Sequence, residues 1–452
     1  MFSTKVLQLN NMPDQKSVAL ILFAYGSEIR QFVYSGFVDE LNSHYRVVVA
    51  ARIVTENLKR LSKQHGFELR ELVHSEPNDL QRYFFGKADA VFARAYHTKK
   101  KFSYYGNSGE QRMPVKYPGF YRWLLPFVNW IEKVSFALVR AQEVDRFLSD
   151  INPAVIIVNL PRSPYLLRPL FQSKRLGACN VLVFNTLKEV DANGRMNIPV
   201  DLYLTWNAES SAELLRYNPQ IDRQDVHAAG SPYYDRSFPQ EVGGCNKHLL
   251  YCAANPKSLP NEVAFVERLF INLNSAGLLD GKTFVVRPNP MDDNFSRWNG
   301  LAQRTGINVE VPKWIWQPEN NWNEALQEDV DNYSRLLGEA KFVMGSASTV
   351  AIDAVMLGKP FICIADNFWP DEIDGCDFRY FAEAENFRPV RQSRAVLCAE
   401  NFDEMVRFMQ REGGRFSPDD MPAVVYDAKR TAGQRIVEKL LRGKVPCKIP
   451  AD

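Results

Sequence analysis

Short apolar runs alternate with helix-like segments along most of the chain. The run SVALILFA at 17–24 is continuously apolar, which is typical of a strand buried on both faces. The segment that follows predicts a helix with Ser27 as its N-cap. Its apolar residues recur at helical spacing: Ile29, Phe32, Val33, Phe37 and Leu41. A strand at 45–50 and a helix at 56–64 come next, and such β–loop–α–β units build parallel sheets.

The same alternation continues to about residue 230. The pattern lapses from 78 to 119 and resumes with a long helix at 121–149. Beyond it we expect two short helices, at 166–177 and 209–216. The remaining apolar runs predict strands at 154–160, 180–186, 200–206 and 226–229.

A second round of alternation follows a polar stretch with two adjacent glycines at 237–247, the best candidate for a linker. Expected strands lie at 248–253, 282–288, 309–312, 342–345 and 360–365. Expected helices lie at 261–274, near Arg297, and at 333–340, 349–357, 402–410 and 428–441. We therefore predict two Rossmann-like α/β domains, 1–240 and 241–452, facing a cleft, with the last helix crossing back to the first domain. Open α/β sheets bind ligands at the carboxyl ends of their strands.

Composition narrows the function classes. Of the 452 residues, 46% are hydrophobic and 24% are charged, which excludes a disordered, collagen-like or coiled-coil chain. The net charge of +2 argues against a dedicated nucleic-acid binder. Seven cysteines without a CxxC pair predict neither a disulfide framework nor a zinc site. The chain shows neither a secretory signal nor an apolar segment of spanning length, so we expect a cytoplasmic protein that could sit on a membrane surface.

The most informative stretch for chemistry is 341–365. An apolar strand ends at Gly345, a turn of small residues (346–349) opens a helix, and Asp353 lies one turn further on. The free N–H groups of a helix start favour an anion, and small residues let a phosphate approach. Asp353 could then bind a ribose hydroxyl. An ordinary strand–turn–helix with a serine N-cap explains the same pattern, and the sequence leaves both readings open.

Together with three other segments, this stretch resembles the GT-B-fold glycosyltransferases of bacterial surface polysaccharides, of capsule or lipopolysaccharide type. The other segments are AGSPYYD at 229–235, VVRPNP at 285–290, and the polar loop 185–194 followed by DLYLTW at 201–206. The resemblance implies transfer of a sugar from a nucleotide-sugar donor to a glycan or lipid-linked acceptor. It places the acceptor in the first domain and the donor in the second.

The donor residues that the resemblance implies are Arg287, Asn289, Ser346, Ser348, Thr349 and Asp353. Arg287 follows an apolar strand and could form charge-assisted bonds to a pyrophosphate, or alternatively a salt bridge across its loop. Asn289 stands where the family usually has histidine, which weakens the case for a CMP-sugar and leaves a UDP- or GDP-linked donor open.

An inverting transferase needs a base that removes the acceptor proton. Glu28 is the first candidate, although it could merely complement a helix dipole; Asp191 and Glu189 are the next. No group of residues has metal-ligand spacing, so we expect a metal-independent enzyme without a cofactor. We also expect the sugar transfer to be inverting.

Basic and aromatic residues gather between 97 and 130. Lys99, Lys100, Lys101 and Trp123 predict contact with an anionic membrane surface or a lipid-linked acceptor. The alternative is a long loop whose aromatic residues pack on the protein's own core. Two other functions stay open for the whole chain: a sugar-nucleotide epimerase of the same fold, and a non-catalytic scaffold of a glycan-assembly complex.

Overall fold

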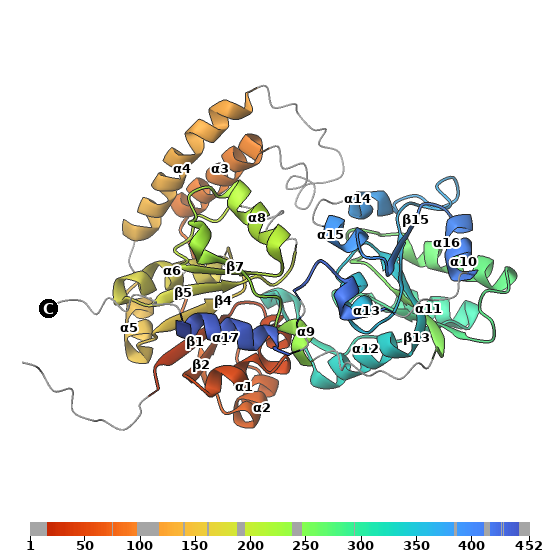
Figure 1. Ribbon diagram of the computed structural model, residues 1–452, viewed down its shortest axis with the longest axis horizontal. Coiled ribbons are helices and arrows are strands. Elements are labelled where there is room, and N and C mark those ends of the chain that lie inside the picture. The colour runs from red at the N-terminus through yellow and green to blue at the C-terminus, as the bar shows by residue number, and fades with distance from the viewer. Residues whose placement is uncertain are drawn as a thin grey trace, which may run out of the picture.

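The computed structural model describes residues 16–74, 76–96, 117–138, 141–160, 162–187, 195–236, 246–292, 294–383, 387–410, 416–425, 427 and 429–442. These residues form two α/β domains that lie side by side (Figure 1). The predicted boundary at residue 240 falls in 237–245, outside the described residues.

The first domain is built on a seven-stranded parallel sheet with the order β3-β2-β1-β4-β5-β6-β7. Its strands are β1 (Val18–Phe23), β2 (Arg46–Ala51), β3 (Glu68–Glu71), β4 (Val155–Val158), β5 (Cys179–Val183), β6 (Leu202–Thr205) and β7 (Val226–Ala228). Its helices are η1 (Arg30–Tyr34), α1 (Phe37–Asn42), α2 (Glu56–His65), α3 (Asp79–Tyr96), α4 (Pro118–Leu138), α5 (Gln142–Ile151), α6 (Pro164–Ser173), α8 (Ala208–Tyr217) and α9 (Tyr233–Arg236). The central strands β1, β4 and β5 are covered on both faces, which explains their continuous apolar runs.

The second domain has a six-stranded parallel sheet with the order β10-β9-β8-β13-β14-β15. Its strands are β8 (His248–Cys252), β9 (Thr283–Arg287), β10 (Asn308–Val309), β13 (Ala340–Ser346), β14 (Phe361–Ile364) and β15 (Val396–Ala399). Its helices are α10 (Glu262–Ser275), α11 (Ser296–Thr305), α12 (Gln327–Glu339), α13 (Val350–Met356), α14 (Phe378–Ala382), α15 (Arg388–Arg391) and α16 (Phe402–Gln410). The predicted fold class, two Rossmann-like domains, is confirmed.

Several elements differ from the prediction. The helix expected after β1 is broken, because Gly36 takes a left-handed conformation (φ 80°) between η1 and α1, and Ser27 caps neither piece. The stretch 78–119, where the alternating pattern lapses and no element was predicted, contains α3 (Asp79–Tyr96). The long helix expected at 121–149 is two helices, since Ala141 is extended (φ −113°, ψ 102°) where α5 begins. None of the described helices combines the length and apolar composition that crossing a bilayer requires.

The last helix, α17 (Ala432–Arg442), packs on the first domain, as predicted (Figure 1). Its apolar side Ile436, Val437 and Leu440 joins the core under β1 and β2. Asp235 fixes its start by accepting hydrogen bonds from the N–H groups of Ala432 (2.8 Å) and Gly433 (2.7 Å).

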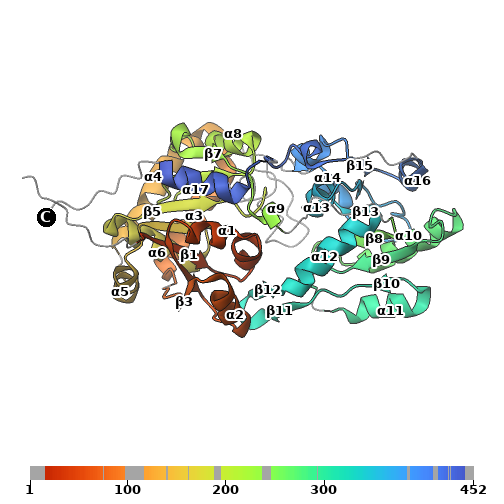
Figure 2. The same ribbon diagram turned by 60° about the horizontal axis from the view of Figure 1, so that its bottom comes forward.

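An unpredicted antiparallel hairpin, β11 (Trp314–Gln317) and β12 (Trp322–Ala325), reaches from the second domain to the first (Figure 2). Asn323 donates its backbone N–H to the carbonyl of Tyr25, just after β1 (2.8 Å). Gly26 has a positive φ of 89°, and a Cβ there would lie 2.6 Å from the Asn323 carbonyl oxygen and 2.8 Å from the Trp322 ring. Glycine therefore permits this close contact between the domains.

Buried side chains strengthen the same contact. Glu324 is fully buried and accepts hydrogen bonds from Thr55 (2.8 Å) and Asn57, both of the first domain. Tyr34 donates its hydroxyl proton to the carbonyl of Ala325 (3.0 Å). The hairpin thus connects the carboxyl edge of the first sheet to the second domain.

Candidate functional site

Side chains from both domains meet between the carboxyl ends of the two sheets. We call this group the interdomain cluster: Arg30, Tyr233, Arg287, Tyr333 and Asp353. Arg30 donates a hydrogen bond to the Tyr233 hydroxyl and lies over the Tyr233 ring at 4.6 Å. Tyr333 donates to Asp353 Oδ2 (2.8 Å), and the Arg287 guanidinium lies 5.0 Å from the centre of the Tyr333 ring. Electrostatic interactions of Arg30 with Asp353 and of Tyr233 with Arg287 couple the two halves.

Arg287 is the most informative member of the cluster. It ends β9 and is only 5% exposed. Its Nη2 donates to Asp329 Oδ2 (2.7 Å), an ion pair buried on both sides. Its Nη1 is buried and makes no hydrogen bond. A buried charged donor without an acceptor is unfavourable, so this nitrogen is suited to an anionic oxygen.

The Asp329 carboxylate accepts two hydrogen bonds besides its ion pair with Arg287. It accepts hydrogen bonds from Trp314 Nε1 (2.8 Å) and from the backbone N–H of Lys313 (2.9 Å). The predicted alternative of a salt bridge for Arg287 is therefore present, and it occupies only one of the two terminal nitrogens of the guanidinium.

Asp353 is 4% exposed, and its burial raises its pKa from 3.8 to about 6. The positive charge of Arg30 and hydrogen bonds from Tyr333 and Tyr234 act in the opposite direction. Tyr333 occupies one acceptor position of Oδ2, and a carboxylate has about four, so the predicted bond to a ribose hydroxyl does not require Tyr333 to leave.

The raised pKa predicts a pH-dependent stability. Between about pH 4 and pH 6 the folded protein holds the Asp353 proton more tightly than the unfolded chain, so the contribution of Asp353 to the free energy of unfolding falls as pH rises through this range. The full effect is up to ~3 kcal/mol for a shift of about two units. Asp353→Asn is neutral at every pH and escapes the loss. In urea unfolding, we expect the free energy of unfolding of the variant to rise relative to that of the wild type from pH 4.5 to pH 7. A difference that does not change with pH would contradict the raised pKa of Asp353.

The turn that opens α13 is tightly packed at its base. A Cβ on Gly345 would lie 2.5 Å from the carbonyl oxygen of Cys252, and Ser346 is buried. Ser348 and Thr349 are half-buried. Thr349 is the N-cap, and its side chain makes no capping hydrogen bond, so the alternative of a serine cap is not what the structure shows.

Two other predicted residues, Asn289 and Glu28, accept hydrogen bonds from nearby backbone N–H groups. Asn289 closes its own turn, since its Oδ1 accepts the N–H of Met291 (2.9 Å). Glu28 is fully buried and accepts the N–H groups of Ala24 (2.7 Å) and Tyr25 (3.2 Å), and burial raises its pKa. In this conformation Glu28 therefore shapes the turn after β1, and its role as a base stays a prediction.

Glu262 plays the same part in the second domain. It is fully buried, accepts the N–H of Ala254 just after β8 (2.9 Å), and burial raises its pKa to about 7. Each sheet thus has a buried glutamate that holds the turn after the strand that comes first in its domain. Of the other predicted site residues, Asp191, Glu189, Lys99, Lys100 and Lys101 lie outside the described residues, and Trp123 is exposed on α4.

Sequence reasoning missed Arg30, Tyr233 as a contact residue, Tyr333 and Asp329. Arg30 lies within a helix-like pattern and resembles an exposed position, and only the packing of α12 brings Tyr333 to Asp353. The pairing of Arg287 with Asp329 spans 42 residues, so no local pattern indicates it.

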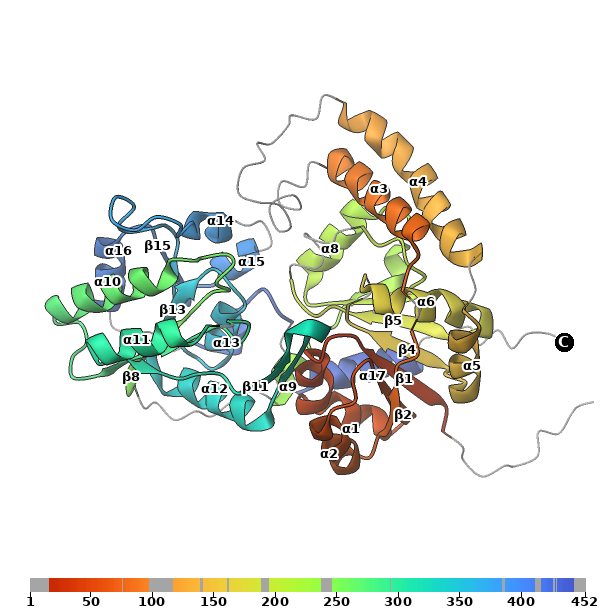
Figure 3. The ribbon, with the colours of Figure 1, turned by 180° about the vertical axis from the view of Figure 1, so that it is seen from behind.

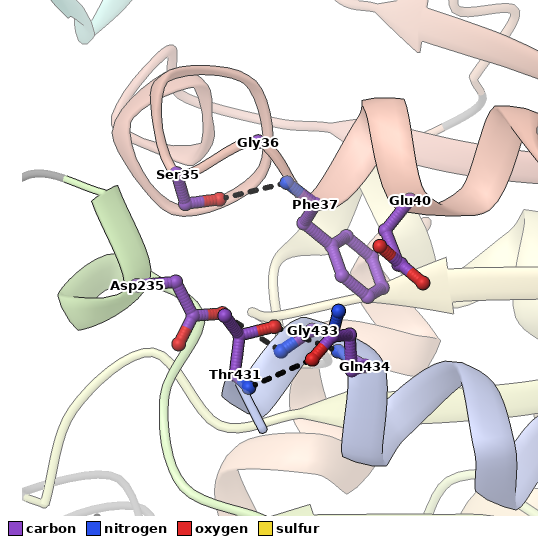
Figure 4. A pocket seen from close by; sticks show the side chains of 8 residues that line it. All are labelled: Ser35, Gly36, Phe37, Glu40, Asp235, Thr431, Gly433 and Gln434. Atoms are coloured by element: carbon purple, nitrogen blue, oxygen red, sulfur yellow. Dashed lines mark hydrogen bonds between the residues drawn. The ribbon is translucent and has the colours of Figure 1, made fainter. Parts of the chain in front are cut away.

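Two small pockets lie beside α9 and α17. The first, of about 90 Å³, is lined by residues of α1, α9 and α17, among them Phe37 and Asp235 (Figure 4). The second, of about 110 Å³, lies between Tyr234, Met356 and the segment before α17. Both are small beside ligand pockets of about 300–1,000 Å³. The described part of the chain contains no group of three His, Cys, Asp or Glu residues placed to hold a metal.

Comparisons with known proteins bear on this geometry. No protein-family model matches the sequence, and a search of curated proteins finds no significant match. Solved structures do match. The UDP-GlcNAc 2-epimerase of Methanocaldococcus jannaschii is 11% identical with a TM-score of 0.52, and the match covers 94% of this chain and 99% of that chain. The Neisseria meningitidis UDP-GlcNAc 2-epimerase bound to UDP-GlcNAc is 12% identical with a TM-score of 0.51, covering 94% and 100%.

These similarities correct the prediction of a glycosyltransferase. The matching structures are those of epimerases, so the comparison favours the epimerase alternative over sugar transfer to an acceptor. The resemblance of the sequence motifs extends to the shared two-domain architecture. The chain has the two-domain, GT-B-like fold of these UDP-GlcNAc 2-epimerases.

Proposed function

We propose that the chain is an enzyme that binds a nucleoside diphosphate sugar between its two domains and inverts a stereocentre of the sugar. The observation that carries the proposal is the buried Nη1 of Arg287, which has no hydrogen-bond partner. The Arg287 guanidinium lies over the ring of Tyr333, which binds Asp353 of α13. A diphosphate oxygen would supply the acceptor through a charge-assisted bond. The similarity of fold to UDP-GlcNAc 2-epimerases supports the choice of a UDP-sugar as the first ligand to test.

The remaining donor residues would then surround the nucleotide. Small side chains at Ser346 and Ser348 leave room for the diphosphate, with Thr349 at the start of α13. Asp353 would accept a hydrogen bond from a ribose hydroxyl in addition to the one from Tyr333. Because Arg287 and Asp353 are nearly inaccessible, the ligand reaches them only when the two domains move apart.

The sugar would face the carboxyl edge of the first sheet, where an epimerase needs an acid–base group. Polar and aromatic side chains gather there. Ser163 donates to the Tyr25 hydroxyl (3.2 Å), the Arg52 guanidinium lies 4.3 Å from the centre of the Tyr165 ring, and His74 lies edge-on to the same ring at 5.1 Å. His74 is the candidate acid–base group here, because histidine is the side chain that most often transfers protons in enzymes.

Incubation with UDP-GlcNAc in deuterated water tests the proposal. Removal and return of a carbon-bound proton should give a second UDP-sugar, separable by chromatography, with deuterium at the inverted carbon seen by proton NMR. Ile271→Gln, on the surface of α10, is the matched control and should keep full activity. UDP-glucose is the second substrate to test in the same way. A folded protein that neither binds nor converts either UDP-sugar would contradict the proposal, and binding without conversion would indicate the non-catalytic scaffold.

A further inference from the structure

The outer side of α4 carries large aromatic side chains that face solvent. Phe120, Trp123, Phe127 and Trp130, which we call the aromatic stripe, are 56%, 76%, 57% and 59% exposed. Their spacing of three, four and three residues puts them along one side of the helix. Neighbouring rings contact each other: Phe120 lies 6.2 Å from Trp123, and Phe127 lies 6.3 Å from Trp130.

The opposite side of α4 is firmly packed, so the stripe is the uncovered face of a fixed element. Leu125 and Phe136 are buried, and the Phe136 ring stacks on Phe171 of α6 at 5.1 Å. The carboxylate of Glu132 is buried and paired with Arg195. Figure 3 shows α4 beside α3 at the edge of the first domain, away from the second domain.

The charges around the stripe have one sign. Arg122 and Lys133 are exposed, and they lie three turns apart on one line of the helix, bordering the stripe. The single acidic residue of α4, Glu132, faces inward to Arg195. On the adjoining helix α3, Lys87 and Arg94 are exposed, and neither has an ion pair within the described parts of the chain.

We propose that the aromatic stripe docks on the surface of an anionic lipid bilayer, with the rings in the headgroup region and the flanking basic residues on lipid phosphates. Aromatic rings favour the membrane interface, and basic residues gain about 1 kcal/mol each near an anionic surface. A contiguous exposed apolar face of this kind marks an interaction site. This inference is independent of the proposed function, since it rests on α4 alone.

A second copy of the chain fits the stripe less well. In a symmetric dimer the same patch would face itself, so Arg122 and Lys133 of both copies would approach one another. With Glu132 buried, α4 offers no exposed carboxylate to compensate for these charges. An anionic bilayer supplies the compensating charge that a second copy lacks.

Vesicle flotation with the full chain tests the proposal. The wild type should float with phosphatidylcholine vesicles that contain about 30% phosphatidylglycerol, and bind pure phosphatidylcholine weakly. Trp123→Gln/Trp130→Gln should lower the partition coefficient at least about tenfold, because two interfacial rings are lost. Lys133→Gln should lower it about fivefold on anionic vesicles only. Since these side chains are exposed, we expect unchanged melting temperatures.

The matched control is Ile271→Gln, which removes an exposed apolar side chain on α10 of the other domain and should leave flotation unchanged. Wild-type protein that stays unbound at low salt would overturn the proposal. So would a concentration-dependent dimer that the double tryptophan variant dissociates while vesicle binding is absent, because the stripe would then cover a second copy.

Discussion

Replacing Arg287 by glutamine should weaken the binding of UDP at least about 100-fold, or ~3 kcal/mol, in isothermal titration. The guanidinium is buried, its Nη2 is committed to Asp329, and its Nη1 makes no hydrogen bond. In our account a diphosphate oxygen completes the hydrogen bonding of Nη1. Glutamine loses the positive charge and offers one amide NH2 group in place of the two terminal nitrogens of the guanidinium.

The single variant also leaves the Asp329 carboxylate without its buried counter-ion, which is destabilising. Arg287→Gln/Asp329→Asn removes both charges and keeps the shape of the pair, so it separates folding from binding. Arg304→Gln, an exposed arginine of the same domain paired with Glu267, is the matched control and should bind UDP normally. Full UDP affinity in a folded double variant would show that the diphosphate lies elsewhere.

Trp322→Ala should lower the free energy of unfolding by about 3–5 kcal/mol. Trp322 is fully buried in the hairpin between the domains, contacts Gly26 across the interface and donates its Nε1 proton to Glu324 (3.1 Å). Its removal leaves a cavity at the contact and weakens the hold of the hairpin on the first domain.

The comparison for this effect lies in the same hairpin. Trp316, on β11, is only half-buried, so Trp316→Ala should cost much less stability. Urea unfolding followed by circular dichroism measures both variants. Equal losses would mean that the hairpin contributes no specific contact between the domains.

The strands were predictable because parallel strands covered on both faces read as uninterrupted apolar runs, as in β1, β4 and β14. Helix α3 escaped detection because its buried residues include Gln81, Ala88 and Ala95, which give a weak apolar pattern. The β11–β12 hairpin escaped because its buried Glu324 is satisfied by Thr55 and Asn57 of the other domain. A charged residue with a distant partner cannot be recognised as buried from its neighbours in sequence.

Some residues of the candidate site were predictable from the sequence, and others were not. Arg287 stands at the end of a predicted strand and Asp353 one turn inside a predicted helix, and both lie in the interdomain cluster. Arg30 and Tyr333 enter it only through the packing of the two domains. Glu28 stays a predicted base, and the sequence did not indicate that its oxygens accept the backbone N–H groups of the turn after β1.

The most direct measurement is a crystal structure of the chain with UDP. We expect the diphosphate between the two domains, with an oxygen within about 3 Å of Arg287 Nη1, small residues 346–349 around it, and a ribose hydroxyl on the Asp353 carboxylate. UDP bound away from both Arg287 and Asp353 would contradict the proposed site.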